Sequence, residues 1–568
     1  MSSFIYKEGQ TFAAKMISLF GLLMIFKSVV FEGHGVSGEL YSSLAHMDDL
    51  FVFDMKVAEL LPYLPTSVPE VTSYKESYLC LLQDVMTLAK GNTLDAAITG
   101  NPLHLFTVIK RLFLYWPPIK RSIDRILSAE STCEDKSDLC KWWADLLECT
   151  KNPTFMIIDC PLSCGVCGKP GANAELHKKL PSLEELERKI MLPSANDLGG
   201  ASLALARLQQ IYRIPIQELA TGTIANVTTS VVLSLYDCIR IANESYHEGQ
   251  YVNAWQWFDY AEVTTFSPGM RDLIKGFKNS IAIEHDKNHV PSNPNFFLHP
   301  IAQDTSQVPP DNAYFSLCRG NSMLRDASKT NLKCYISSRG SPYLILRPIK
   351  VEQVIHDPEL YLFYDVISDK ESKVIKDLSS NQLERSKVVT HKDAVELRVS
   401  QTAWLRNTSH PSLPTIAKRI AAITGLYVFE DEGNIFAGEQ LQTLSYGIGG
   451  HYSYHPDVIW KYDLPENWEN HREKFPDFES GDRLATWMFY LSDVEAGGRT
   501  AFPWAGVSVK PLKGSAVFWY NLKRNGRMNP RSEHGGCPVL LGHKWVANKW
   551  IRENINFMRR PCTIDEQE

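Results

Sequence analysis

The stretch 446–460, YGIGGHYSYHPDVIW, contains a His-x-Asp pair formed by His455 and Asp457. Residues two apart in an extended strand point to the same side, so both side chains can reach one metal ion. Pro456 between them stiffens the backbone and carries no charge. The pair alone is a weak signal, because a glycine-rich turn can hold a histidine and an aspartate without binding a metal. A metal site needs at least one further ligand.

A candidate third ligand is His534, in the segment RSEHGGCPVL, which lies between two strand-like patterns. Two histidines and one carboxylate can occupy one face of an octahedral ion and leave three positions open. This arrangement suits an Fe(II) ion that must bind an organic co-substrate and dioxygen together, whereas a catalytic zinc ion is more often tetrahedral with one open position. His455, Asp457 and His534 are therefore the predicted ligands of an Fe(II) ion.

Lys544, in GHKWVANKW, begins a further strand-like segment at 544–551. On such a strand it would share a face with Val546, Asn548 and Trp550. A lysine on the inner face of a barrel needs an anionic partner, and the far carboxylate of a dicarboxylate co-substrate would supply one. The alternative is a lysine on the protein surface, which is the usual location for this residue type.

The strands that would position these residues lie in the C-terminal part of the chain. The segments ATWMFYLSD (485–493), SVKPLKGSAVFWYNL (508–522) and KWVANKWI (544–551) are rich in aromatic and β-branched residues and are separated by turn residues. Because no helical pattern lies between them, they predict an antiparallel barrel or jelly roll, that is, a double-stranded β-helix, within 313–568. The Pro- and Asn-rich stretch 286–312 before it reads as a linker.

The upstream half of the chain has helical periodicity in two regions. The first, 39–127, is either an ordinary packing domain or a surface for homodimerisation. The second, 183–285, follows Ser182, and the spacing of Ser182 and Glu185 predicts a capping box at a helix start. Helices first and strands last make the predicted fold class a multidomain α+β protein.

Within the second region, YHEGQYVNAWQWFDYAE (246–262) has the pattern of a tetratricopeptide helix pair. Aromatic grooves bind polyproline II segments, which makes Tyr246, Tyr251 and Trp257 candidate contacts for a peptide. The alternative is that these aromatic side chains belong to the hydrophobic core.

Six of the 12 cysteines lie between residues 133 and 168. A segment of about 35 residues cannot build an adequate apolar core, so disulfides must close it. Six cysteines allow 15 pairings, and their spacing does not choose among them. Zinc binding is the alternative, and it is uncommon in a secretory compartment. The closing CPLSCGVC resembles the ShKT module, and this resemblance implies the pairs Cys133–Cys167, Cys140–Cys160 and Cys149–Cys164.

The first 38 residues have the features of a secretory signal peptide. The apolar run MISLFGLLMIF (16–26) lies between Lys15 and Lys27 and is too short and interrupted for a comfortable membrane span. Met16 is an alternative start, and a membrane anchor or a buried helix is an alternative to the signal. Glycosylation sequons occur at Asn226, Asn243 and Asn407. The chain ends in TIDEQE rather than KDEL, so retention in the endoplasmic reticulum would need another protein.

The segments of the C-terminal region together resemble the alpha subunits of collagen-type prolyl 4-hydroxylases. The matching segments, spread over 313–568, are YGIGGHYSYHPD, RLATWMFYLSDVEAGGRTAFP, KGSAVFWYNL, HGGCPVLLGHKWVANKWI and the terminal RRPC. The resemblance implies that His455, Asp457 and His534 bind Fe(II) and that Lys544 binds the far carboxylate of 2-oxoglutarate. It also implies that Tyr446 and Thr500 lie near this co-substrate, and that disulfides join Cys318 to Cys334 and Cys537 to Cys562.

The same resemblance implies an activity and its setting. The enzyme would hydroxylate peptidyl proline to 4-hydroxyproline with O₂ and 2-oxoglutarate, and would release succinate and CO₂. Ascorbate would keep the iron reduced. The substrate would be a collagen-like or other proline-rich chain, the compartment the lumen of the endoplasmic reticulum, and the partner a protein disulfide isomerase subunit.

Two other function classes stay open from the sequence. One is a hydroxylase with the same cofactors that acts on another peptidyl residue, such as lysine. The other is a non-enzymatic, disulfide-stapled binding protein, which the three ligands and Lys544 argue against. The net charge of −6, from 59 Lys and Arg against 65 Asp and Glu, argues against nucleic acid as the main partner.

Overall fold

The computed structural model describes residues 47–65, 68–88, 96–130, 134–165, 172–288, 313–324, 331–386, 398–430, 436–459 and 478–563. The predicted signal peptide (1–38), Cys133, Cys167 and most of the predicted linker lie outside the described residues. Among the residues described, no helix is both long enough and apolar enough to cross a membrane.

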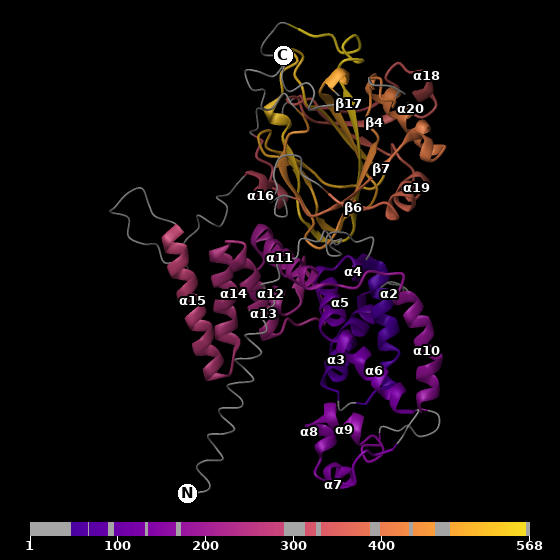
Figure 1. Ribbon diagram of the computed structural model, residues 1–568. Helices are drawn as coiled ribbons and strands as arrows, with labels where there is room; N and C mark the ends of the chain where they lie inside the picture. Colours follow the sequence, from indigo (N-terminus) through magenta and orange to yellow (C-terminus); the bar gives the residue numbers. More distant parts are fainter. Residues whose placement is uncertain are drawn as a thin grey trace, which may run out of the picture.

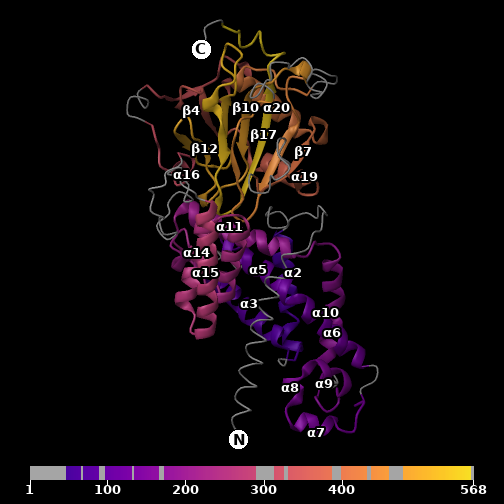
Figure 2. The same ribbon diagram turned by 60° about the vertical axis from the view of Figure 1, so that its left-hand side comes forward.

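The N-terminal half of the described chain is helical, as predicted. Its first helices are α2 (Met47–Ala58), α3 (Pro69–Leu88), α4 (Ala96–Thr99), α5 (Pro102–Leu114) and α6 (Trp116–Glu130). After a small module come α10 (Ala172–Glu187), α11 (Ala195–Tyr212), α12 (Ile216–Ala220), the hairpin β1 (Thr223–Ile224) and β2 (Val227–Thr228), α13 (Leu235–His247), α14 (Tyr251–Thr264) and α15 (Pro268–Asn288). Buried side chains from both sets form one hydrophobic core. Figures 1 and 2 show these helices together on one side of the β-rich part.

Two helices of the second set begin at capping boxes. Ser194 and Asp197 start α11, and Ser234 and Asp237 start α13, with side chain and backbone bonded in both directions. The predicted capping box at Ser182 is wrong. Ser182 lies inside α10, where its hydroxyl donates to the carbonyl of Lys179. The helix continues through Pro181, so neither the proline nor the Ser–Glu spacing marks a boundary there.

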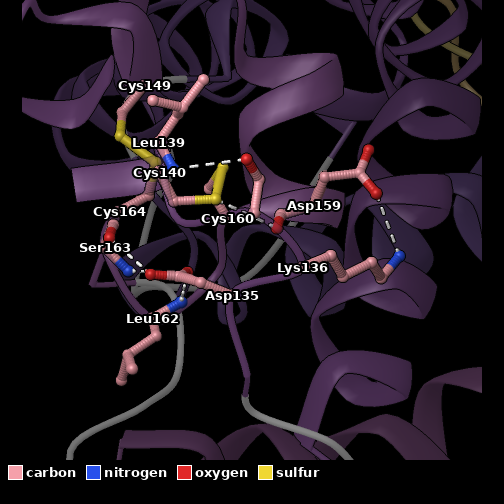
Figure 3. Close-up of a disulfide and its surroundings, with 11 residues drawn as sticks. Asp135, Lys136, Leu139, Cys140, Cys149, Asp159, Cys160, Leu162, Ser163 and Cys164 are labelled. Atoms are coloured by element: carbon pink, nitrogen blue, oxygen red, sulfur yellow. Dashed lines mark hydrogen bonds and ion pairs between the residues drawn. A yellow bond between two sulfur atoms is a disulfide. The ribbon is translucent and has the colours of Figure 1, made fainter. Parts of the chain in front are cut away.

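The small module between the two helical sets contains α7 (Cys140–Asp145), α8 (Glu148–Lys151) and α9 (Pro153–Asp159). Figure 3 shows its disulfides Cys140–Cys160 and Cys149–Cys164, so two of the predicted pairs are confirmed. The Asp135 carboxylate accepts hydrogen bonds from the backbone of Leu162 and Ser163 and ties the ends of the module together. Its buried core is small, as the sequence length predicted.

The C-terminal part forms two main antiparallel sheets from the described residues. The larger has the strand order β3-β4-β5-β14-β10-β17-β8-β7-β6, and the smaller has the order β13-β12-β15-β9. The larger sheet consists of β3 (Cys334–Ser337), β4 (Ile349–Ile355), β5 (Leu360–Tyr364), β6 (Glu384–Arg385), β7 (Gln401–Leu405), β8 (Leu441–Tyr446), β10 (Arg483–Tyr490), β14 (Ala516–Tyr520) and β17 (Lys544–Arg552). The smaller consists of β9 (Tyr452–His455), β12 (Thr500–Phe502), β13 (Val507–Val509) and β15 (His534–Gly536). The strands β11 (Ala496–Gly497) and β16 (Val539–Leu541) form a separate two-stranded antiparallel sheet.

The two sheets share one apolar core, which includes Met488 and Trp519 from the larger sheet and Phe502 from the smaller one. Helices α19 (Asp369–Ser380) and α20 (Ser412–Thr424) bury apolar residues against the other face of the larger sheet, with α18 (Pro342–Ile345) beside them. Two antiparallel sheets packed face to face confirm the predicted jelly roll.

The helical region contacts the segment that links His534 to Lys544. The hydroxyl of Tyr212, at the end of α11, donates to the carbonyl of Pro538. The backbone N–H of Gly542 donates to the carbonyl of Gly100 at 2.9 Å. The helices therefore support the loop from which β17 begins, as their closeness in Figure 2 indicates.

The two disulfides expected in the C-terminal region are wrong. Cys318, at the end of α16 (Ala313–Cys318), is bonded to Cys537, and their Cα atoms are 5.4 Å apart. Cys334 and Cys562 are exposed and unbonded. The physical reason is packing: Cys318 and Cys537 lie in one buried cluster with residues of the smaller sheet, whereas Cys334 begins the edge strand of the larger sheet.

Disulfide mapping tests this pairing. Digestion of the non-reduced protein, followed by mass spectrometry, is expected to yield a cross-linked peptide that contains Cys318 and Cys537. Cys318→Ser should lower the free energy of unfolding by about 2–5 kcal/mol, because the bond closes a long loop of the unfolded chain. Cys334→Ser, at an exposed and unbonded position, is the matched control and should change stability little. A Cys318–Cys334 peptide as the main product would contradict the pairing.

Candidate metal and co-substrate site

The three predicted metal ligands come together at the end of the jelly roll. His455 ends β9, Asp457 follows two residues later, and His534 begins β15. His455 and His534 are register partners in the antiparallel pair of β9 and β15, which places their side chains side by side. One ligand atom from each of the three residues lies within 4.8 Å of the other two. The structure thus brings together residues that are far apart in the sequence.

Hydrogen bonds of the imidazole rings orient both histidines. Nδ1 of His455 lies 2.8 Å from the carbonyl oxygen of Ser453, and Nδ1 of His534 lies 3.1 Å from that of Ser532. A carbonyl only accepts, so Nδ1 carries a proton in each ring, and Nε2 is the nitrogen that can coordinate a metal ion. The two Nε2 atoms lie 3.9 and 3.8 Å from carboxylate oxygens of Asp457.

The protonation states of these groups suit a metal ion. Burial, together with the nearby His534, lowers the pKa of His455 to about 3, so the ring is neutral near pH 7. Burial alone would raise the pKa of Asp457, but the nearby His534, His455 and Arg483 hold it below its usual value. Two imidazoles and one carboxylate are a donor set that fits Fe(II) with open coordination positions.

Lys544 is buried, with 2% of its surface exposed, so the surface alternative is wrong. It begins β17 and is the register partner of Tyr446 in β8, and its Nζ lies 4.8 Å from the centre of the Tyr446 ring. Burial lowers the pKa of Lys544 to about 7. Within the described part of the chain, no carboxylate forms an ion pair with it. A buried ammonium group without an anion is costly, and an anionic ligand would offset that cost.

One cavity of about 1060 Å³ joins Lys544 to the three ligands. Tyr446 and Thr500, the residues expected near the co-substrate, also line it. Gly536 lines the cavity beside Lys544: a Cβ atom at this position would lie in ordinary contact with Nζ, at 3.5 Å. An anion that reaches Lys544 and an ion held by the histidines would therefore share a single space.

The sequence reasoning missed two arginines that line this cavity. The guanidinium of Arg398 lies 4.5 Å from the ring centre of Tyr452. Arg483 is paired with Glu439 and lies 3.5 Å from the ring centre of Trp550. Arg483 opens the apolar strand RLATWMFYL, and a charge at the start of an apolar strand was the available signal.

The candidate peptide contacts on α13 and α14 have different environments. Trp257 has none of its surface exposed, so its assignment as a peptide contact is wrong and the core alternative holds for it. Tyr246 and Tyr251 are half-buried, and their ring centres lie 5.8 Å apart.

The three predicted glycosylation sequons differ in exposure. Asn243 is buried within α13, which contradicts its use as a glycosylation site. Asn226 is exposed and Asn407 is half-buried.

Comparison with protein-family models gives three matches along this chain. The prolyl 4-hydroxylase alpha-subunit N-terminal region matches residues 171–226, the ShK domain-like family matches 132–167, and the 2OG-Fe(II) oxygenase superfamily matches 441–552. The last of these matches covers all three candidate ligands and Lys544.

Similar curated proteins match most of the chain. Human prolyl 4-hydroxylase subunit alpha-1 is 30% identical over 512 residues, which cover 77% of this chain and 91% of that protein. Human prolyl 4-hydroxylase subunit alpha-3 is 30% identical over 563 residues, which cover 86% of this chain and 99% of that protein. Among solved structures, the viral collagen prolyl hydroxylase from Paramecium Bursaria Chlorella virus-1, in its 2OG complex, is 25% identical, with 34% of this chain and 95% of that chain covered and a TM-score of 0.26.

Proposed function

This chain belongs to the family of prolyl 4-hydroxylase alpha subunits, and we propose that His455, Asp457 and His534 hold the Fe(II) ion of its dioxygenase reaction. The convergence of these three side chains, with each Nε2 atom less than 4 Å from an oxygen of Asp457, is the observation that supports this assignment. When bound, Fe(II) and 2-oxoglutarate supply the oxidising chemistry, and 2-oxoglutarate leaves as succinate and CO₂.

Lys544 binds the far carboxylate of 2-oxoglutarate in this proposal. Its ammonium group lies in the same cavity as the ligands, and the described residues give it no counter-ion. The incoming carboxylate would raise the pKa of Lys544 again, because an opposite charge nearby favours the protonated form. Tyr446 and Thr500 would contact the co-substrate, since both line the cavity and both are buried.

The proposed reaction is hydroxylation of peptidyl proline to 4-hydroxyproline, in collagen-like or other proline-rich chains. The cavity extends from the ligands to Trp404 and Trp550, whose ring centres lie 5.8 Å apart, so a peptide segment has room beside the candidate iron site. Aromatic rings are suited to contact proline. Hydroxylation of peptidyl lysine is the second candidate, because the metal ligands alone do not distinguish the two residues.

A peptide panel tests the reaction and its substrate. The full chain is incubated with Fe(II), 2-oxoglutarate and ascorbate, together with Gly-X-Pro repeats, a proline-rich peptide without the glycine repeat, or Gly-X-Lys repeats. We expect succinate release only with proline peptides, and the gain of one oxygen atom on proline by mass spectrometry. Oxygen gain on lysine alone would favour the second candidate. No peptide-dependent succinate release with any member would contradict both.

The helical region from 183 to 285 is the proposed peptide-binding domain, with Tyr246 and Tyr251 as contacts. Tyr251→Ala is expected to raise KM for the proline-rich peptide several-fold with little change in stability. Trp257→Ala is the matched comparison and should lower the free energy of unfolding by about 3–5 kcal/mol, because the ring is fully buried. Urea unfolding and steady-state kinetics measure the two effects. An unchanged KM in the Tyr251 variant would exclude this residue as a contact.

The remaining proposals concern the setting of the enzyme. We propose that residues 1–38 direct it to the lumen of the endoplasmic reticulum, that ascorbate maintains its iron, and that a protein disulfide isomerase subunit retains it there. The proposed domain division is 39–127 helical, 133–168 ShKT-like, 183–285 peptide-binding, 286–312 linker and 313–568 dioxygenase. Homodimerisation would use the helices of 39–127. Co-purification from microsomes, with the mass of the complex measured by light scattering, checks the partner and the dimer.

A further inference from the structure

A line of buried hydrogen bonds leads from the core of the jelly roll to the Asp457 carboxylate. Thr486 Oγ1 lies 2.6 Å from Asp457 Oδ2 and accepts a hydrogen bond from Asn521 Nδ2 at 2.9 Å. Asn521 Oδ1 in turn accepts from Trp519 Nε1 at 2.8 Å. At most 1% of the surface of Thr486, Asn521 and Trp519 is exposed, so these bonds do not compete with bulk water.

The direction of every bond in this line follows from its first member. The indole Nε1 of Trp519 can only donate, so Asn521 must turn Oδ1 towards it and Nδ2 towards Thr486. Thr486 therefore accepts from Asn521, and its single hydroxyl proton is directed to Asp457 Oδ2. An ionised carboxylate only accepts, so each of the three bonds in this line has one donor and one acceptor.

The sheet fixes the line in place. Thr486 in β10 and Trp519 in β14 are register partners, so their side chains lie on the same face of the larger sheet. Asn521 follows two residues after Trp519, and its backbone N–H donates to the carbonyl of Leu484. The ring of Trp519 also packs edge-on against His534, with 4.5 Å between ring centres. One buried tryptophan therefore contacts one candidate ligand directly and a second through two intervening side chains.

We infer that Thr486, Asn521 and Trp519 are positioning residues that hold the Asp457 carboxylate in one orientation for the metal ion. This inference rests on the proposed role of Asp457 as a ligand. The bond from Thr486 prevents the carboxylate from turning about its Cβ–Cγ bond. Among the described residues, no hydrogen-bond donor reaches Oδ1, so its lone pairs remain available to the ion. Groups that hold metal ligands in this way typically contribute roughly 10–100-fold to metal affinity.

Metal affinity measured without turnover tests the inference. Mn(II) is titrated into the metal-free full-length chain and free Mn(II) is followed by electron paramagnetic resonance. Thr486→Val keeps the shape of the side chain but removes the hydroxyl, and we expect it to weaken Mn(II) binding by roughly 10–100-fold. Thr486→Ser keeps the hydroxyl and should stay within about threefold of the wild-type affinity.

A second variant reverses the line without changing the size of any side chain in it. In Asn521→Asp both carboxylate oxygens accept, so the hydroxyl of Thr486 would turn to the introduced carboxylate and away from Asp457. Mn(II) binding should again weaken. Thr443→Val is the matched control, because Thr443 is a buried, hydrogen-bonded threonine in β8 that does not line the cavity. It should lose stability in thermal unfolding and keep its Mn(II) affinity.

The outcomes separate this inference from the proposed function. If Thr486→Val binds Mn(II) as the wild type does while Asp457→Ala does not bind it, the positioning role is wrong and the ligand assignment stands. If Asp457→Ala binds Mn(II) as the wild type does, the ligand assignment itself is wrong. Equal losses of affinity in the Thr486→Val and Thr443→Val variants would mean that lost stability, not orientation, causes the effect, and would overturn the inference.

Discussion

His534→Ala is expected to abolish peptide-dependent release of succinate. The variant would leave one histidine and one carboxylate, and the ion would lose a third of its protein ligands. A bound metal ion stabilises the transition state by several kcal/mol. Its loss therefore lowers the rate of succinate release at least ~10³-fold. Succinate release with the proline peptide and Mn(II) affinity should fall together, because both depend on the same imidazole.

The controls for this variant separate metal loss from damage to the fold. The His534 ring packs against Trp519 and Phe502, so its removal also leaves a void in the core. Thermal unfolding measures that cost. Added imidazole can fill the void and should restore part of the Mn(II) affinity if His534 is a ligand. His451→Gln removes the buried histidine directly before β9, which is not among the clustered ligands, and should keep Mn(II) binding. Substantial activity in the His534→Ala variant would refute the site.

The pairing of His455 with Asp457 could be predicted from the sequence, because side chains two residues apart in a strand point to the same side. His455 and Asp457 lie on one side of an extended segment, and β9 and the residues after it place them so. The distance from His455 to His534 has no such rule. It depends on the pairing of β9 with β15, so the sequence offered His534 only as a candidate between two strand-like patterns, which the family resemblance then supported.

The incorrect predictions for Trp257 and for the C-terminal disulfides concern packing between elements. The helical pattern of 246–262 showed that Trp257 lies on an apolar face, but not that other helices cover it completely. Cys318 and Cys334 are close in the sequence, yet Cys318 packs against the smaller sheet and Cys334 lies in the larger one. Such contacts between segments that are distant in the sequence carry no periodic signal, which is also why Thr486 and Asn521 were not recognised.

Lys544→Met is expected to raise KM for 2-oxoglutarate by about 30-fold or more, because breaking a buried charge pair costs about 2–5 kcal/mol. The maximal rate at saturating 2-oxoglutarate should change much less, since the ligands of the ion are intact. Methionine has a similar length, so the cavity keeps its shape. Steady-state kinetics, with the concentration of 2-oxoglutarate varied at a fixed concentration of peptide, measures KM and the maximal rate separately. An unchanged KM would remove Lys544 from the co-substrate site.

The same variant should be more stable than the wild type when no co-substrate is present. In the folded protein the pKa of Lys544 is lowered to about 7, below its value of about 10.4 in the unfolded chain. The unfolded state thus binds more protons between these values, so the stability of the wild type rises with pH from 7 to 10. Below pH 7 the destabilisation by the buried lysine is full, at most ~5 kcal/mol. The Tm of Lys544→Met should therefore exceed that of the wild type at pH 7, and this difference should decrease towards pH 10. Calorimetry measures both values.

The lowered pKa also makes binding of 2-oxoglutarate dependent on pH. Below pH 7 Lys544 is already protonated in the empty site, and KM for 2-oxoglutarate should be nearly constant. Above pH 7 the site must take up a proton with the ligand, so KM should rise by up to about tenfold per pH unit. In Lys544→Arg the charge is permanent and this rise should disappear, even if the longer side chain binds 2-oxoglutarate less tightly. A wild-type KM that stays constant from pH 6.5 to 8.5 would mean that Lys544 is already charged in the empty site, and that an anion or water there compensates for its burial.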